Sequence, residues 1–268
     1  MNLIVDISYA VFYRFYAIKS YLKISKQNGT ISLNIDDERF RELYMKTFCD
    51  MMQKLATKFK ASTILFCVDC PREKIWRRVH MPTYKNRRQL DDFDGRVFKY
   101  TFEEVIPELK ERLKAKKSTR MTTVHLVSHP HCEADDIAYV ISRQILGKDK
   151  KVIITGDHDY LQLLDENTEI YNLKYASLKD KSRGDNDTDI LSKCICGDVS
   201  DNIPKLMSKK ELENLFAMRS NEDIKELFSA DERFQMNMRM IDLRYIPEEY
   251  VNEIKSTFDL DEECCTNG

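Results

Sequence analysis

The chain has 268 residues and a mass of 31.7 kDa, enough for one sizeable hydrophobic core with a smaller subdomain attached. Its composition is 42% hydrophobic and 33% charged, with 7 glycines and 6 prolines, which excludes a fibrous or disordered chain. No apolar run approaches the roughly 18 residues of a membrane span, and the first residues lack the basic region of a signal peptide. The net charge of −2 does not by itself indicate a nucleic-acid-binding protein.

The 8 cysteines are too few for the disulfide framework of a small secreted domain, so we expect an intracellular, reducing environment. Cys67 and Cys70 form a CxxC pair, but the pair spans the end of a predicted strand. The spacing of Cys194 and Cys196 does not suit a zinc knuckle. A structural zinc site requires four ligands with two suitable spacings, which the sequence does not supply.

Strand patterns and helix patterns alternate through residues 1–185. Short apolar runs predict strands at residues 3–5, Thr63–Val68, Val124–Val127, Val152–Ile154 and Glu169–Leu173. Apolar residues at helical spacing predict helices at Tyr9–Leu22, Asp37–Lys60, Gly95–Lys116 and Glu133–Leu146. This alternation predicts an α/β fold with a central, mostly parallel sheet covered by helices on both faces.

The patterns beyond residue 185 are helical, with helices expected at Glu211–Met218, Asp223–Phe228 and Glu248–Phe258. We therefore divide the chain into an α/β core, residues 1–185, and a helical C-terminal subdomain, residues 186–268. No strand pattern appears between Cys70 and Lys117, so residues 70–131 are interpreted as an insertion within the core.

Acidic residues follow the predicted strands or begin the next helices. A single acid at a strand end is more often a helix cap, but its repetition at several strand ends favours a shared site. Because parallel strands end at one edge, these carboxylates would point into one crevice and repel one another. Mg²⁺ or Mn²⁺ would relieve that repulsion, and two such ions about 4 Å apart can activate a water for phosphodiester hydrolysis. The predicted metal ligands are Asp6, Asp69, Glu133, Asp135, Asp136, Asp157, Asp159, Asp198 and Asp201.

A local basic stripe lies between Arg72 and Arg88, with seven basic residues and one acid, Glu73. A basic stripe alone is often only a solvated surface. When an acidic cluster is also present, the basic stripe suits binding of a polyanion and the acidic cluster suits binding of a metal.

The ordered motifs resemble the flap endonuclease/5′–3′ exonuclease family. They are Asp6 after an apolar strand, Phe66–Asp69, Glu133–Asp136, Thr155–Asp159 and Gly197–Pro204. Trp76–Arg78, Tyr84–Lys85 and Ile241–Pro247 resemble the ribonuclease H branch found in T-even bacteriophages, whose members are 5′ nucleases. The resemblance spans residues 3–258 and implies a PIN-like core with a helical arch in the insertion.

The resemblance also implies roles for the carboxylates. Asp6, Asp69, Glu133 and either Asp135 or Asp136 would surround the first metal. Asp157, Asp159 and Asp198 would hold the second, assisted by Asp201. Glu133 and Asp136 lie three apart on a predicted helix and would share a face, with Asp135 pointing elsewhere; which of the two adjacent aspartates binds directly stays open.

The basic residues take nucleic-acid roles in this interpretation. Lys85 or Arg88 would neutralise the scissile phosphate, and Tyr84 would stack on an unpaired base. The other expected contacts in the stripe come from Arg77, Arg78 and Arg87. A helix–three-turn–helix should begin at Gly197, but the family's glycine-rich hairpin is replaced by Lys205–Lys210. This loss argues against a K⁺ site there, and Lys205, Lys209 and Lys210 would bind the duplex by charge instead.

The expected enzyme hydrolyses phosphodiesters near a 5′ end with two Mg²⁺, removing RNA primers or 5′ flaps in phage or viral replication and repair. Its substrates would be 5′-flap or nicked DNA and RNA–DNA hybrids, and it would act as a monomer inside the infected cell, with a single-strand-binding protein or a clamp as a candidate partner. Two alternatives remain open. One is a PIN-type endoribonuclease, and the other is a replication factor that binds branched DNA without cutting it.

Overall fold

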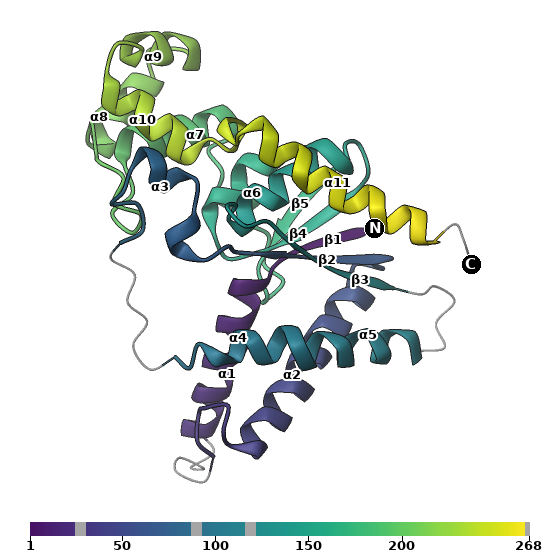
Figure 1. Cartoon of the computed structure of the whole chain (residues 1–268). Helices are drawn as coiled ribbons and strands as arrows, with labels where there is room; N and C mark the ends of the chain where they lie inside the picture. The colour runs from purple at the N-terminus through teal and green to yellow at the C-terminus, as the bar shows by residue number, and fades with distance from the viewer. Residues whose placement is uncertain (25–30, 87–92, 116–121, 266–268) are drawn as a thin grey trace.

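The computed structural model describes residues 1–24, 31–86, 93–115 and 122–265, with side chains of the last helix described to Phe258. Parallel strands form one sheet in the order β3-β2-β1-β4-β5 (Figure 1). The strands are β1 (Asn2–Asp6), β2 (Thr63–Val68), β3 (Thr123–Ser128), β4 (Lys151–Ile154) and β5 (Thr168–Tyr171). The predicted α/β fold with a parallel sheet is confirmed.

Helices cover both faces of this sheet, because its strands are apolar on both sides. In β1, Leu3 and Val5 belong to one core and Ile4 to the other, and all three are 0% exposed. One face carries α1 (Ile7–Ile24), α2 (Glu38–Lys58), α4 (Arg96–Tyr100), η2 (Thr101–Val105) and α5 (Ile106–Ala115). The other carries α6 (Ala134–Tyr139), η3 (Val140–Ile145), η4 (His158–Leu163) and α11 (Glu248–Cys265) (Figure 1).

Part of the segment predicted as an insertion belongs to the core. The helical run from Arg96 to Ala115 buries Val97, Ile106 and Leu109 against α1 and α2 instead of standing over the strand ends. Its apolar stripe accounts for this position, since an amphipathic helix buries that stripe against the sheet layer. Residues 122–131 of that segment contain β3, which belongs to the sheet. The described stretch Cys70–Asn86 contains η1 (Arg72–Lys74) and α3 (Arg77–His80).

The C-terminal helices build a third core. They are α7 (Asn186–Cys196), α8 (Lys209–Phe216), α9 (Asn221–Phe228) and α10 (Glu232–Ile241), flanked by η5 (Lys179–Lys181) and η6 (Leu243–Tyr245). The sequence patterns delimited neither α7 nor α10. Ile75 and Tyr84 pack into this third core, so the Cys70–Asn86 segment is anchored to the C-terminal helices. In the described part of the chain, no helix is both long and apolar enough to cross a membrane.

Candidate metal centre

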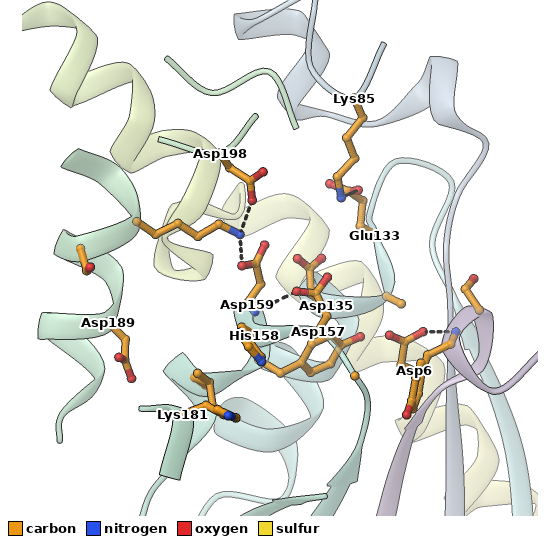
Figure 2. A pocket seen from close by; sticks show the side chains of 18 of the residues that line it. Asp6, Lys85, Glu133, Asp135, Asp157, His158, Asp159, Lys181, Asp189 and Asp198 are labelled. Carbon is orange, nitrogen blue, oxygen red and sulfur yellow. Dashed lines mark hydrogen bonds and ion pairs between the residues drawn. The ribbon is translucent and has the colours of Figure 1, made fainter. Parts of the chain in front are cut away.

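An open crevice of about 800 Å³ lies at the carboxyl ends of the central strands (Figure 2). β1 and β4 are parallel neighbours with Val5 opposite Ile154, so the residues that follow them emerge side by side. Seven of the nine carboxylates predicted as ligands line the crevice: Asp6, Asp69, Glu133, Asp135, Asp157, Asp159 and Asp198. The other two predicted ligands, Asp136 and Asp201, are 0% and 2% exposed and are not among its lining residues.

Asp6 and Asp69 are fixed by hydrogen bonds at the ends of β1 and β2. Asp6 accepts from the backbone N–H of Tyr9 at 2.9 Å and from the hydroxyl of Thr155 at 3.0 Å. Asp69 accepts from the hydroxyl of Ser8 and from the backbone N–H of Ala134 at 2.8 Å. Burial, reinforced by the charge of Asp69, raises the pKa of Asp6 to about 7. A bound cation would favour the charged form of such a carboxylate.

The turn after β4 brings Asp157 and Asp159 to the same place. A Cβ atom on Gly156 would lie 2.6 Å from Cε2 of Tyr9, so only glycine allows the turn to pass this ring. Asp157 then caps η4 by accepting from the N–H of Asp159 at 3.0 Å. Burial and the neighbouring charge of Asp159 raise the pKa of Asp157. The element that Asp157 caps is a short 3₁₀ helix.

The start of α6 corrects our expectation about its two aspartates. Glu133 is the extended N-cap residue, and Asp136 folds back to accept from the Glu133 N–H at 3.0 Å. The three-residue spacing is therefore a capping box and does not place both side chains on one exposed face. Asp135 lines the crevice, and burial together with the charge of Asp136 raises its pKa. Oxygens of Glu133, Asp135 and Asp136 lie within 4.8 Å of one another, but those of Asp136 are occupied by other donors.

The guanidinium of Arg77 donates to both carboxylate oxygens of Asp136. This corrects the prediction that Arg77 contacts nucleic acid. Its side chain is 1% exposed. The guanidinium donates to Asp136 Oδ1 at 2.8 Å, to Glu133 Oε2 at 3.0 Å and to the carbonyl oxygen of Met240 at 2.8 Å. Buried charges require such partners, so Arg77 orients the two acids and has no face free for a phosphate.

Among the described basic residues of the stripe, Lys85 lines the crevice. Figure 2 shows its side chain beside that of Glu133. The Lys85 Nζ lies 2.5 Å from Glu133 Oε1 and 3.7 Å from Asp201 Oδ2. Burial opposes the charged form of Glu133. The charges of Lys85 and Arg77 nevertheless hold the pKa of Glu133 below its usual value. Asp201 thus lies beside Lys85, and its backbone N–H also donates to Asp198 Oδ1 at 3.3 Å.

Tyr84 is 2% exposed and packs into the third core, which corrects the prediction that it stacks on a base. Arg78 is half-buried and donates to the carbonyl oxygen of Pro82 at 3.1 Å. Arg87 and Arg88 lie outside the described residues.

Lys193 is a lining residue that the sequence interpretation missed. Its ammonium bridges Asp159 and Asp198, with 3.0 Å from Nζ to Asp198 Oδ2. Burial opposes the ionised form of Asp198, but hydrogen bonds from Ser200 and the Lys193 charge lower its pKa to about 2. The signal was present in the sequence, because Asp189, Ser192, Lys193 and Cys196 recur at the spacing of one helix face, and all four line the crevice.

A tight turn, Asp198–Ile203, follows α7. Its ends are joined by Asp198 N to Ile203 O at 3.1 Å and Ile203 N to Asp198 O at 2.8 Å. Gly197 ends α7 with a φ of 71°, where a side chain would meet Ile203 O at 2.7 Å. Gly197, where the sequence predicted the start of a helix–three-turn–helix, is therefore the C-cap of α7. Lys205, Lys209 and Lys210 are exposed, and Lys209 also lines the crevice.

The donor set fits a hard divalent cation. The crevice presents carboxylate oxygens from five separate segments, which is the ligand type that Mg²⁺ and Mn²⁺ prefer. Burial first, and neighbouring acids second, raise the pKa values of Asp6, Asp135 and Asp157. A positive ion between them would remove this cost.

Comparison with known proteins agrees with this geometry. The T5 D15 protein crystallised with metal ions is similar in structure, with a TM-score of 0.58 and 19% identity over 96% of this chain and 98% of that chain. A variant of the bacteriophage T5 D15 flap endonuclease, in a pseudo-enzyme–product complex with DNA and metal ions, gives a TM-score of 0.61 and 17% identity over 98% of this chain and 100% of that chain. At such identities the likeness establishes the fold. No curated protein matches the sequence.

A match to a sequence family identifies the family as well as the fold. Residues 1–190 match the family described as the 5′–3′ exonuclease, N-terminal resolvase-like domain. The match covers most of the chain and includes six of the seven carboxylates that line the crevice. The chain therefore belongs to the 5′–3′ exonuclease family of nucleases.

Proposed function

We propose that this protein is a structure-specific, metal-dependent 5′ nuclease. Its substrates would be 5′-flap or nicked DNA and RNA–DNA hybrids, and its role the removal of RNA primers or 5′ flaps in phage or viral replication and repair. The observation that carries the proposal is the convergence of seven carboxylates and the ammonium groups of Lys85 and Lys193 in one open crevice. The similar T5 protein is named a flap endonuclease and was crystallised with DNA and metal ions, which supports a DNA substrate.

Two Mg²⁺ ions, or Mn²⁺ in their place, are the proposed cofactors. Asp6, Asp69, Glu133 and Asp135 would hold the first, and Asp157, Asp159 and Asp198 the second. Bound divalent cations would lower the pKa of a water molecule and stabilise negative charge on the phosphodiester. Asp136 has no ligand role in this proposal, because Arg77 occupies its carboxylate.

Lys85 would act directly on the substrate phosphate. Its ammonium has three N–H donors, and the carboxylates of Glu133 and Asp201 are its ion-pair partners at the crevice wall. This half-buried ammonium keeps its charge beside these acids and can donate to a phosphate oxygen in the crevice. Lys205 and Lys210, with Lys209 at the crevice wall, would hold the duplex by charge.

The proposal is tested with labelled 5′-flap DNA, nicked duplex and RNA–DNA hybrid, each incubated with Mg²⁺ and with EDTA. Asp157→Asn and Asp198→Asn should abolish cutting and largely spare binding of the flap. Asp149→Asn is the matched control, because this exposed acid precedes β4 at the opposite edge of the sheet and should retain full activity. Full Mg²⁺-dependent cutting by both crevice variants would contradict the assignment of Asp157 and Asp198 as metal ligands.

The same assay separates the alternatives. Cutting of a hairpin-loop RNA but of no 5′-flap DNA would identify an endoribonuclease. Tight binding of branched DNA, with no cutting in Mg²⁺ or Mn²⁺, would identify a binding factor. The binding factor is not the expected outcome, because carboxylates from several strand ends line the crevice.

A further inference from the structure

The turn after α7 is joined to the segment that carries Lys85. The backbone N–H of Lys85 donates to the carbonyl oxygen of Asp201 at 3.2 Å. In the opposite direction, the side-chain amide of Asn202 donates to the carbonyl oxygen of Thr83 at 2.6 Å. Two turns separated by more than 100 residues in sequence are thus paired by reciprocal hydrogen bonds.

Both partners adopt an uncommon backbone conformation at this junction. Lys85 has a φ of 55° and Asn202 a φ of 62°, the left-handed region. Asparagine tolerates that region, whereas it is strained for lysine. Such a conformation persists where surrounding contacts impose it. Two hydrogen bonds lie on either side of this position: Lys85 N–H donates to Asp201, and the Asn202 amide donates to Thr83.

The side chains continue the same junction. Asp201 is 2% exposed, and its carboxylate lies 3.7 Å from Lys85 Nζ, which also contacts Glu133 at the start of α6. The ammonium is therefore held by one acid from the α/β core and one from the C-terminal subdomain. The outer part of the turn is open to solvent, since Val199 is 81% exposed.

We propose that Asp201 and Asn202 are positioning residues that set Lys85 at the reaction centre. The inference rests on the proposed function of Lys85. It gives the C-terminal turn a role beyond holding the duplex, because displacement of the turn moves the backbone of Thr83 and Lys85. Cutting would then depend on a docked C-terminal subdomain even when the substrate is already bound.

The test is a double-mutant cycle measured as single-turnover cutting of a saturating 5′-flap substrate in Mg²⁺. Asn202→Gly keeps the left-handed conformation and removes only the amide, and Asp201→Asn removes only the charge. Each should slow cutting about three- to tenfold, with flap affinity changed less than about twofold. In a Lys85→Ala background, neither substitution should slow cutting further, because groups that act through one residue are not additive.

Asn186→Ala is the matched control. Its side-chain amide also donates to a backbone carbonyl, that of Leu164 at 2.9 Å, but the bond lies away from Lys85. It should cost similar thermal stability to Asn202→Gly and leave the cutting rate unchanged. Equal slowing by the Asn202 and Asp201 substitutions with and without Lys85 would overturn the positioning role and leave Lys85 itself catalytic. No slowing by Lys85→Ala alone would overturn both proposals for Lys85, while metal-dependent cutting would still support the nuclease.

Discussion

Replacement of Arg77 by methionine tests how the crevice is held together. Methionine retains most of the side-chain volume and removes the guanidinium. The structure gives that group contacts with Asp136, Glu133 and the carbonyl oxygen of Met240, all at 2.8–3.0 Å, at a side-chain exposure of 1%. Glu133 keeps Lys85 as a partner, so the group left without its counter-charge is the carboxylate of Asp136, which is 0% exposed.

The expected loss follows from this burial. Removal of one partner from a buried ion pair costs about 3–5 kcal/mol, because the remaining charge is neither solvated nor paired. A domain of ordinary stability has about 5–15 kcal/mol in total, so Arg77→Met should lose about a fifth or more of its free energy of unfolding. The carboxylate of Asp136 also caps α6, which links this loss to the orientation of Asp135.

Urea denaturation followed by far-ultraviolet circular dichroism measures the loss. Arg78→Met is the matched control, because the adjacent arginine is half-buried and makes one hydrogen bond to Pro82 O at 3.1 Å. Its loss should stay below about 1 kcal/mol. If Arg77→Met loses no more than Arg78→Met, the buried network does not stabilise the crevice in the way the contacts indicate.

Three further predictions concern charge. Lys193→Met removes a cation that competes for the carboxylates of Asp159 and Asp198. Ca²⁺ should therefore bind there about fivefold more tightly, roughly 1 kcal/mol. Equal or weaker binding in a calorimetric titration would contradict this. The pKa of Asp6 is about 7 in the fold and 3.8 ordinarily, so between these values the folded state holds a proton that the unfolded chain has lost. The metal-free protein should therefore gain stability as the pH falls from about 8 to about 5, and thermal melts in EDTA that show the opposite trend would refute it. Alanine at any one of Lys205, Lys209 and Lys210 should reduce the salt dependence of duplex binding by about one charge, measured by fluorescence anisotropy across NaCl concentrations, and an unchanged slope would remove that lysine from the interface.

The strand ends were accessible from sequence because their signals are local. Each apolar run of β1, β2 and β4 is short and is followed closely by an acid, as at Asp6 and Asp69. Parallel strands place those acids at one edge, so their convergence follows from element type alone. The α6 start was less accessible, since a capping box and a shared helix face have the same three-residue spacing. Only the extended backbone of Glu133 distinguishes them.

The basic stripe shows what the sequence left undetermined. Arg77, Tyr84 and Lys85 carry similar signals for phosphate or base contacts in the sequence. In the structure, Arg77 and Tyr84 are buried and Lys85 reaches the crevice. The difference arises from helices more than 100 residues later, since Met240 O accepts from Arg77 and the third core covers Tyr84. The sequence by itself determined which acids end the strands, because that pattern is local. The tertiary structure alone decided which basic side chains reach the crevice, because burial depends on contacts between distant segments.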